Sequence, residues 1–555
     1  MAKETTIKKR RIAHKDNLSL KNIYIGQVDT TIELDINNKE IKNDFYYSYF
    51  IRNEGEVNSF LNGSKCFVYG QKGAGKTAFL RFIGEKLERD EESQKKFDLY
   101  LFSKDFPRAI YDDITEFTAR KNDINPEDFH YRLNPFRDID YENLWTFIIL
   151  KKLNEHLVSG KCLKAKDDIY LERFNSLLKS AEIGSVLDRF ARLLPRIHSG
   201  SARISKDPSV EMKLEFDGSK DDFVKFAEYI GNLKEVFKDI SFVSGTYYMM
   251  FDEIDPRVGS GKAFDLDCIL IRDLIITIYN LNRAQNKRER RLFICAAIRT
   301  EILREVNRLG KEVHKYLEAL GVAMNWGEIG KRDVDHPLIR MICKKIIYSE
   351  KKFGIFGHQD EEKYDYIWKK YFRKANREAL SPNELLRVSW MKPRDIVRRL
   401  NECKNIDGDS RVFTKSLLDR SFTTYSHQSW RDVQDQLSGS VGPDTVSALE
   451  TVLSRFIRQF NINDLERRID LIGAGHKKVK LLQQNFGILE LLELLYFHGV
   501  IGILTSKNYT EYFFEGNTSP DFFGRICIHP GLIRKFNSKS ITKKESGEDD
   551  LFSSL

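Results

Sequence analysis

The most informative part of this chain is the sequence CFVYGQKGAGKT at residues 66–77. An apolar run leads into Gly70, and Gly75, Lys76 and Thr77 complete the phosphate-binding pattern G-x-x-x-x-G-K-[ST]. The pattern lies between a predicted short strand and a predicted helix over 78–87, which is the context that such a loop needs. The chemistry that it predicts is the binding of a nucleoside triphosphate with Mg²⁺.

Each residue type in this loop has a physical role. Glycines let successive backbone N–H groups turn toward an anion, and the following helix adds its positive N-terminal end. We expect Lys76 to reach the β- and γ-phosphates and to act in catalysis, and the Thr77 hydroxyl to ligate Mg²⁺. A chance glycine-rich turn is the alternative. The residues predicted to line the nucleotide are Gly70, Gln71, Lys72, Gly73, Ala74, Gly75, Lys76, Thr77 and Ala78.

A pair of carboxylates follows a second apolar run, at residues 246–251. We assign Asp252 to Mg²⁺, because an acidic residue at the end of such a strand binds the ion directly or through water. We assign Glu253 to the attacking water as its general base. Asp255 is a second candidate for either role. The alternative is a strand that merely ends in an acidic surface turn.

Two arginines are candidates to complete the site. Arg299 ends the apolar run 292–298 and could sense the γ-phosphate or stabilise charge in the transition state. A salt bridge to Glu301 is the alternative reading. Arg394, within the sequence KPRD at 392–395, could reach the nucleotide from a helical lid. For Arg394 the alternative is a charge pair at a helix N-terminus.

The apolar runs also predict the sheet that positions these residues. Strands are expected at 98–102, 246–251, 292–298 and 321–326. Strands that alternate with helices indicate a parallel α/β sheet covered on both faces, and such sheets bind ligands at the carboxyl ends of their strands. The stretch 111–240, in which apolar residues have helical spacing, predicts a helical insertion in this core.

The remaining segments differ in composition, and this difference predicts the domain organisation. We expect a weakly structured N-terminal segment (1–43), a P-loop core (44–330), a helical lid (331–403), a polar, loop-rich linker (404–445), a final domain (446–536) and a disordered tail (537–555).

The final domain contains helices followed by a small hairpin, which suggests a winged helix-turn-helix. The segment 489–497 is too apolar to face DNA. A helix expected at 474–484 carries Lys477, Lys478 and Lys480 and is the better candidate. A solvated basic face or a protein-docking surface is the alternative.

Composition limits the class of protein. The 555 residues are 41% hydrophobic and 31% charged, with a net charge of +9, which permits contact with nucleic acid without requiring it. No apolar run is long enough to cross a membrane, and the N-terminus lacks the apolar core of a secretory signal. The seven cysteines form no C-x-x-C pair, so neither a zinc site nor a disulfide framework is indicated. We expect a cytoplasmic protein with no membrane association.

The chain resembles bacterial P-loop ATPases related to the AAA+ origin-recognition ATPases and to the STAND ATPases. The resemblance rests on YGQKGAGKTA (69–78), YYMMFDEID (247–255), FICAAIRTEI (293–302), the region of Trp326, KPRDIVRRLN (392–401) and LLELLYFHGVIG (491–502). It implies an ASCE-type sheet, with an extra strand between those that carry the P-loop and the acidic pair. It further implies a helical lid, a C-terminal winged helix, ATP as the nucleotide, Arg299 as a sensor and Arg394 as the lid sensor.

These features predict a Mg²⁺-dependent ATPase that couples ATP binding and hydrolysis to the assembly or regulation of a partner. We expect a homo-oligomer and a protein partner or effector encoded nearby. The resemblance implies a setting in anti-phage defence or in a DNA transaction. Two alternatives stay open: a nucleotide-dependent scaffold or switch with little turnover, and a DNA-binding regulator that uses the C-terminal domain.

Overall fold

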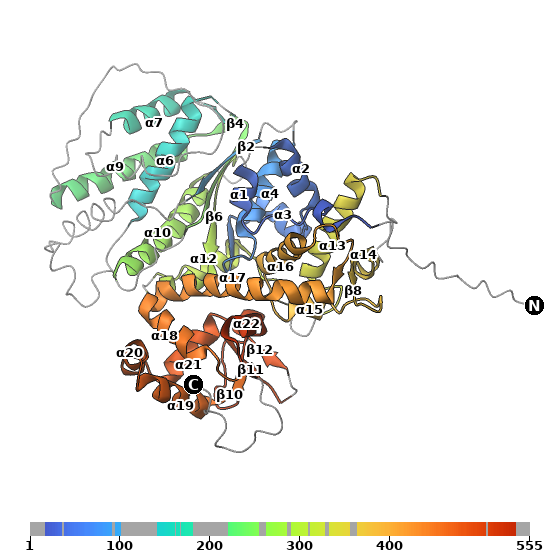
Figure 1. Cartoon of the computed structure of the whole chain (residues 1–555). Coiled ribbons are helices and arrows are strands. Elements are labelled where there is room, and N and C mark those ends of the chain that lie inside the picture. Colours follow the sequence, from blue (N-terminus) through green and yellow to red (C-terminus); the bar gives the residue numbers. More distant parts are fainter. Residues whose placement is uncertain are drawn as a thin grey trace, which may run out of the picture. The chain divides into compact units, whose positions relative to one another are not determined.

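The computed structural model describes residues 17–35, 38–90, 95–101, 141–160, 162–166, 168–180, 220–254, 262–285, 290–308, 311–327, 332–355, 363–506 and 509–539. The chain forms two compact units, whose elements are labelled in Figure 1. One unit, Asn53–Asn325, contains the phosphate loop and is called the sheet unit below. The other combines Met1–Arg52 with Trp326–Leu555 and is called the helical unit.

The sheet unit is built on a five-stranded parallel sheet with the strand order β2-β5-β6-β1-β7. Its strands are β1 (Phe67–Gly70), β2 (Lys95–Leu101), β5 (Thr246–Asp252), β6 (Leu292–Arg299) and β7 (Gly321–Ala323). Strand β6 lies between β1, which leads into the phosphate loop, and β5, which ends at the acidic pair. The predicted parallel α/β fold with an extra strand at this position is therefore confirmed.

The central strands are continuous apolar runs because the sheet is covered on both faces. All side chains of β6 at 292–298 are buried, as are those of β5 at 247–252. Helix α4 packs against β1, β2 and β6, and α10 packs against β6. The helices of this unit are α3 (Glu54–Leu61), α4 (Lys76–Glu88), α6 (Glu142–Val158), α7 (Asp168–Ser180), α9 (Lys220–Asp239), α10 (Lys262–Ala284), α11 (Thr300–Arg308) and α12 (His314–Leu320).

The described parts of the predicted insertion at 111–240 are helical. Helices α6, α7 and α9 contact one another and lie together at one side of the sheet unit (Figure 1). A small two-stranded sheet accompanies them, formed by β3 (Lys164–Ala165) and β4 (Phe242–Ser244). The stretches 102–140 and 181–219 lie outside the described residues.

The N-terminal segment differs from the prediction for residues 1–43. Within its described part, Leu18, Leu20, Ile23 and Ile25 are buried in the helical unit. The Leu20 backbone N–H donates to the carbonyl oxygen of Ser410 at 2.7 Å. The segment continues through the 3-10 helix η2 (Leu20–Asn22), α1 (Thr30–Asp35) and α2 (Lys39–Ser48). The expected boundary at residue 44 was wrong, because α2 packs on α13 (Pro337–Lys352) and the whole of Met1–Arg52 belongs to the helical unit.

The expected linker at 404–445 was also wrong, because most of it is one long helix, α17 (Lys415–Val441). The segment is polar in composition, but its few apolar side chains recur on one face. The buried side chains on this face are Leu417, Leu418, Tyr425, Trp430, Val433 and Leu437. The helix begins at a side-chain cap, since the Thr414 hydroxyl accepts a hydrogen bond from the Leu417 N–H at 3.1 Å. Packing of these apolar side chains against α16 (Pro393–Ile406) and other elements of the helical unit outweighs the polar composition.

The rest of the helical unit consists of short helices and two small sheets. Between α13 and α17, besides α16, lie α14 (Lys363–Tyr371), β8 (Phe372–Arg373), α15 (Asn383–Leu386) and β9 (Phe413–Thr414). After α17 come α18 (Pro443–Leu453), β10 (Gln459–Phe460), α19 (Ile462–Gly473), α20 (Lys477–Asn485), α21 (Ile488–Phe497), β11 (Ile501–Leu504), β12 (Thr510–Glu511), η6 (Phe513–Glu515), β13 (Arg525–Ile528), η7 (Pro530–Leu532) and α22 (Ile533–Phe536).

The C-terminal part of this unit has an antiparallel sheet with the order β10-β13-β11-β12, preceded by α18 to α21. Helix α21 buries Leu491, Leu492, Leu495 and Tyr496, in keeping with the expectation that this apolar helix serves packing. Its exposed positions include Glu490. The winged helix-turn-helix stays a prediction.

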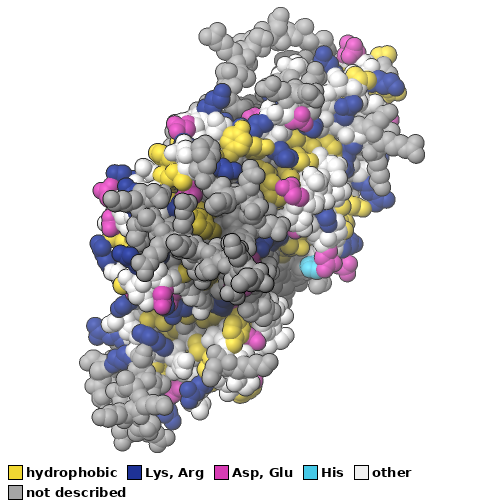
Figure 2. Space-filling view, turned by 90° about the vertical axis from the view of Figure 1, so that its right-hand side faces the viewer, with side chains coloured by type: hydrophobic (Ala, Val, Ile, Leu, Met, Phe, Trp, Pro, Cys, Tyr) yellow, Lys and Arg dark blue, Asp and Glu magenta, His cyan; other side chains and the backbone are white. Residues whose placement is uncertain are grey.

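The surface carries charges of both signs. On the face drawn in Figure 2, Lys and Arg side chains are interspersed with Asp and Glu side chains, as the mild net charge suggests. Among the described residues, no helix combines the length and the apolar character that crossing a membrane requires.

Candidate functional site

Three glycines give the phosphate loop its shape. A Cβ at Gly70, the end of β1, would lie 2.9 Å from the carbonyl oxygen of Met324, so only glycine fits there. Gly73 and Gly75 have φ values of 85° and 94°, in the left-handed region that glycine adopts without steric cost. Gly75 is also the N-cap of α4, so the loop ends at the positive end of a helix. The backbone is therefore shaped to receive an anion.

Lys76 begins α4 and is 9% exposed. Its Nζ donates to the carbonyl oxygens of Gly70 at 2.8 Å and Gln71 at 2.9 Å, so the ammonium group is folded back against the loop. Thr77 and Ala78 follow in the first turn of the same helix. Phosphate oxygens are stronger acceptors for an ammonium group than these neutral carbonyls are.

The acidic pair lies at the end of β5. Asp252 is 2% exposed, and its Oδ1 accepts a hydrogen bond from the Glu253 backbone N–H at 2.8 Å. Glu253 has a φ of 55°, a left-handed conformation that costs a non-glycine residue roughly 1–2 kcal/mol. Such strain persists only where the surrounding structure enforces it, and it is frequent at functional sites. Asp255, the second candidate, lies outside the described residues.

Arg299 ends β6 and is the register partner of Gly70 on β1. The arginine therefore starts beside the glycine at which the loop begins. Glu301 follows in the first turn of α11, where its Oε1 accepts a hydrogen bond from the Lys72 backbone N–H at 2.9 Å. Sequence reasoning considered Glu301 only as a salt-bridge partner for Arg299 and missed its contact with the loop. Its place just after the strand beside β1 was the available signal.

The sheet brings the loop, the acidic pair and Arg299 to one edge. In the register, Phe67 of β1 is paired with Ala296 of β6, which is paired with Phe251 of β5. Neighbouring strands of a sheet lie about 4.8 Å apart, so β1 and β5 are separated by about 10 Å. That separation leaves room for a phosphate and a cation between the loop and Asp252.

The side chains at this edge fit Mg²⁺ bound together with phosphate. The Thr77 hydroxyl and the Asp252 carboxylate are hard oxygen ligands, which is the type that Mg²⁺ prefers. Burial against the core holds the Asp252 carboxylate in place. Mg²⁺ is usually held by one or two protein oxygens with phosphate and water completing its shell, so these two ligands suffice.

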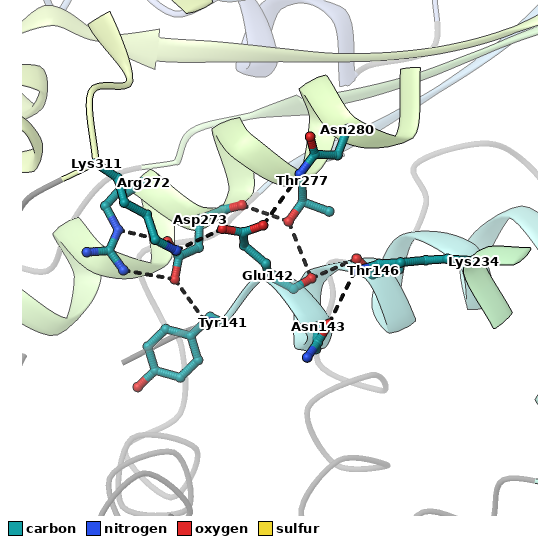
Figure 3. Close-up of polar contacts among 10 residues, drawn as sticks. All are labelled: Tyr141, Glu142, Asn143, Thr146, Lys234, Arg272, Asp273, Thr277, Asn280 and Lys311. Carbon is teal, nitrogen blue, oxygen red and sulfur yellow. Dashed lines mark hydrogen bonds and ion pairs between the residues drawn. The ribbon is translucent and has the colours of Figure 1, made fainter. Parts of the chain in front are cut away.

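A buried polar network connects the insertion to α10, the helix that follows the acidic pair in the sequence (Figure 3). Arg272 and Asp273 of α10 form an ion pair in which Nε and Oδ1 are 2.7 Å apart, and both side chains are fully buried. The Asp273 Oδ2 accepts the Tyr141 backbone N–H at 2.8 Å, just before α6 begins. Lys311, which lies between α11 and α12, donates to Glu142 at 2.8 Å and to Asp273 at 3.5 Å.

This network therefore joins three segments of the sheet unit. The three segments are the insertion helix α6, helix α10, and the loop that follows helix α11, which carries Glu301. A buried ion pair is costly unless its remaining hydrogen-bonding groups are satisfied. The Tyr141 N–H and the Lys311 ammonium group supply part of that satisfaction for Asp273.

Arg394 lies in the helical unit, in the first turn of α16. The next residue, Asp395, is buried and accepts a hydrogen bond from the Trp390 N–H at 2.8 Å, and burial raises the pKa of this carboxyl. A contact of Arg394 with the nucleotide stays a prediction.

Comparisons with known proteins give limited information on this chain. No family model matches it, and no curated protein does. Among solved structures, this chain is similar to that of the ORC2 protein of Aeropyrum pernix in ADPNP-ADP complexes. The two are 10% identical with a TM-score of 0.37, over 89% of this chain and 94% of that one. At this TM-score the likeness carries no argument, so the fold rests on the strand order and the site on the residues above.

Proposed function

We propose that this protein is a Mg²⁺-dependent ATPase. The observation that carries the proposal is the convergence, at one edge of a parallel sheet, of a glycine-shaped loop, a buried aspartate and a strained glutamate. A phosphate-binding loop alone would support nucleotide binding. The acidic pair, two strands away across β6, adds a metal ligand and a base.

Each side chain has a defined task in this proposal. ATP phosphates replace the carbonyl oxygens of Gly70 and Gln71 as acceptors for the Lys76 ammonium group. Thr77 and Asp252 hold Mg²⁺, which neutralises phosphate charge when bound. Glu253 accepts a proton from the attacking water, and Arg299 stabilises the charge that develops on the transferred phosphoryl group.

The proposed use of ATP is to control assembly or a partner protein. The expected order is ATP binding, ordering of the residues around the phosphates, and release of that order on hydrolysis. Arg394 of the lid would contact the nucleotide and so report its state to the helical unit. Anti-phage defence or a DNA transaction is the proposed setting, with a homo-oligomer and an effector encoded nearby.

Steady-state hydrolysis tests the enzymatic part of the proposal. Glu253→Gln should keep ATP binding but lower kcat by at least about 100-fold, because general-base catalysis is worth that much or more. Lys76→Ala should lose ATP binding. Glu235→Gln is the matched control, since Glu235 lies on α9 with a side chain that is 71% exposed.

The same experiment separates an enzyme from a switch. Equal and near-zero turnover in the wild type and in Glu253→Gln, with ATP binding intact in both, would contradict catalysis and favour a nucleotide-dependent scaffold. The DNA-binding alternative rests on the lysines of α20. One of these, Lys478, forms an ion pair of 3.0 Å with Asp444. A titration with DNA at several salt concentrations tests that alternative, because phosphate contacts weaken as salt rises.

A further inference from the structure

A cavity of about 260 Å³ lies within the helical unit, away from every residue assigned above. Its walls come from α16 and α17 on one side and from η7 and α22 of the C-terminal part on the other. Helix α17 packs directly on η7 and α22 (Figure 1). The charged residues that line this cavity are Arg387, Arg399, Lys415, Asp419, Arg458 and Arg534.

Arg399 is the buried member of this set, with 3% of its surface exposed. Its Nη2 donates to the carbonyl oxygen of Leu418 at 3.2 Å, and its guanidinium lies over the rings of Phe422 and Tyr425, at 5.0 and 5.6 Å from their centroids. The Nε and Nη1 atoms are buried without a hydrogen-bond acceptor. A buried guanidinium with unused donors is costly, since each unsatisfied charged group loses its hydration.

The surrounding charges increase that cost. Five cations and one carboxylate, Asp419, line the cavity, and Glu384 is a second ion-pair partner of the lining residue Lys415. Both carboxylates pair with Lys415, at 2.8 and 2.9 Å, and Glu384 also pairs with Arg387. Within the described residues, no carboxylate forms an ion pair with Arg399, Arg458 or Arg534. An anion bound between these like charges would lower their mutual repulsion.

We infer that this cavity binds a phosphate group, held between Arg399 of the lid and Arg458 and Arg534 of the C-terminal part. Guanidinium groups match the geometry of phosphate oxygens and bind them through paired hydrogen bonds. The volume is below the roughly 300–1,000 Å³ of whole-ligand pockets, which favours one or two phosphates over an entire nucleotide. The phosphate can belong to a free anion or to a nucleic-acid backbone.

This site is independent of the proposed ATPase activity, and binding there would change the stability of the helical unit. A phosphate that contacts both the lid and the C-terminal part stabilises their packing in proportion to its occupancy. The bound phosphate therefore holds the two sides of the cavity together within the helical unit.

The test uses the full-length Lys76→Ala protein, in which binding at the phosphate loop is removed. Pyrophosphate is the probe for a free anion, and a fluorescein-labelled 20-nucleotide single strand is the probe for a backbone phosphate. Arg458→Ala and Arg534→Ala remove exposed arginines, so both variants should fold. Arg420→Ala is the matched control, because Arg420 is exposed on α17 and does not line the cavity.

Pyrophosphate should raise the Tm of the Lys76→Ala protein, and each cavity substitution should weaken pyrophosphate binding by about tenfold or more. Arg420→Ala should bind it like its parent. If the backbone is the physiological source, the oligonucleotide binds as well, pyrophosphate displaces it, and Arg534→Ala weakens both. If the source is a free anion, only pyrophosphate depends on Arg534.

Arg399→Leu adds a measurement of stability, the Tm with and without anion, to the binding titrations. Removing a buried, incompletely satisfied charge should leave the Tm without anion unchanged or higher, while the pyrophosphate-dependent rise in Tm disappears. The inference is overturned if neither probe binds the Lys76→Ala protein, or if both bind equally with and without Arg534.

Discussion

The backbone N–H of Lys72 donates a hydrogen bond of 2.9 Å to the carboxylate of Glu301. Lys72 belongs to the phosphate loop, and Glu301 lies in the first turn of the helix that follows Arg299. The shape of the loop is therefore tied to the strand that carries the predicted sensor. The same contact places a negative charge beside the expected position of the phosphates.

Substitutions of Glu301 separate these two effects. Glu301→Ala removes the acceptor and should weaken nucleotide binding by roughly 1–2 kcal/mol, or about 5- to 30-fold, because the loop loses a charge-assisted hydrogen bond. Glu301→Gln keeps an acceptor without the charge, so it should bind at least as tightly as the wild type. Titration with a fluorescent ATP analogue measures both. Wild-type affinity in Glu301→Ala would show that the contact does not organise the loop.

The left-handed conformation of Glu253 predicts that a glycine variant at this position is more stable than an alanine variant. Glycine normally costs roughly 0.5–1 kcal/mol relative to alanine within regular structure. At Glu253 the order should be reversed, with Glu253→Gly more stable than Glu253→Ala by about 1 kcal/mol, because glycine adopts this φ without strain. Both variants should lose turnover.

Glu235 supplies the matched pair for this comparison, since it lies inside helix α9. There, Glu235→Gly should be the less stable of the two variants by about 1 kcal/mol. Urea unfolding of the four proteins gives the two differences. The same sign at both positions would mean that Glu253 is not strained.

The network in Figure 3 predicts that replacing Asp273 lowers the stability of the sheet unit more than replacing Lys311 does. Asp273→Asn removes the carboxylate of the fully buried ion pair with Arg272 and should destabilise the sheet unit by roughly 3–5 kcal/mol. Lys311→Ala removes a side chain that is 38% exposed, so it should cost less than about 1 kcal/mol. Denaturant midpoints measure both effects. Equal costs would indicate that Asp273 relies on Lys311 as much as on Arg272.

The burial of His529 predicts that the stability of the helical unit depends on pH. The imidazole is fully buried against the Trp390 ring, with centroids 4.0 Å apart, and its Nδ1 accepts the Gly531 N–H at 3.1 Å. Burial lowers the pKa of His529 to about 3. The unfolded chain takes up this proton near pH 6.5, so between pH 6.5 and about 3 the unfolded state binds more protons and acid favours unfolding.

The free energy of unfolding should fall by about 1.4 kcal/mol per pH unit, or by roughly 2 kcal/mol at pH 5 relative to neutral pH. His529→Asn, which keeps an acceptor for Gly531, should flatten this slope whatever its stability at pH 7. The control is His427→Asn, at an exposed position on α17. Urea unfolding followed by tryptophan fluorescence at pH 7, 6 and 5 gives the slopes. Parallel slopes for the wild type and His529→Asn would exclude this histidine as the cause.

Local sequence signals were enough to predict the parallel sheet and the candidate residues at its edge. The loop at 70–77 and the apolar runs before Asp252 and Arg299 were readable because their signals are local. A parallel strand buried on both faces must be apolar throughout, and a phosphate loop needs its glycines at fixed positions. The family resemblance implied one strand between the phosphate-loop strand and the strand of the acidic pair, and the order β2-β5-β6-β1-β7 confirms it.

Only the tertiary structure decided the features that depend on partners distant in the sequence. The segment of helix α17 was predicted as a linker because its composition is polar, and its apolar side chains are buried by packing against several elements, among them α16, α18 and α22. The described part of the N-terminal segment packs against residues about 390 positions further along the chain, as the Leu20–Ser410 hydrogen bond shows. The contact of Glu301 with Lys72 and the arginine-lined cavity arise in the same way. Burial and charge at these places are set by neighbours in space, which local patterns do not encode.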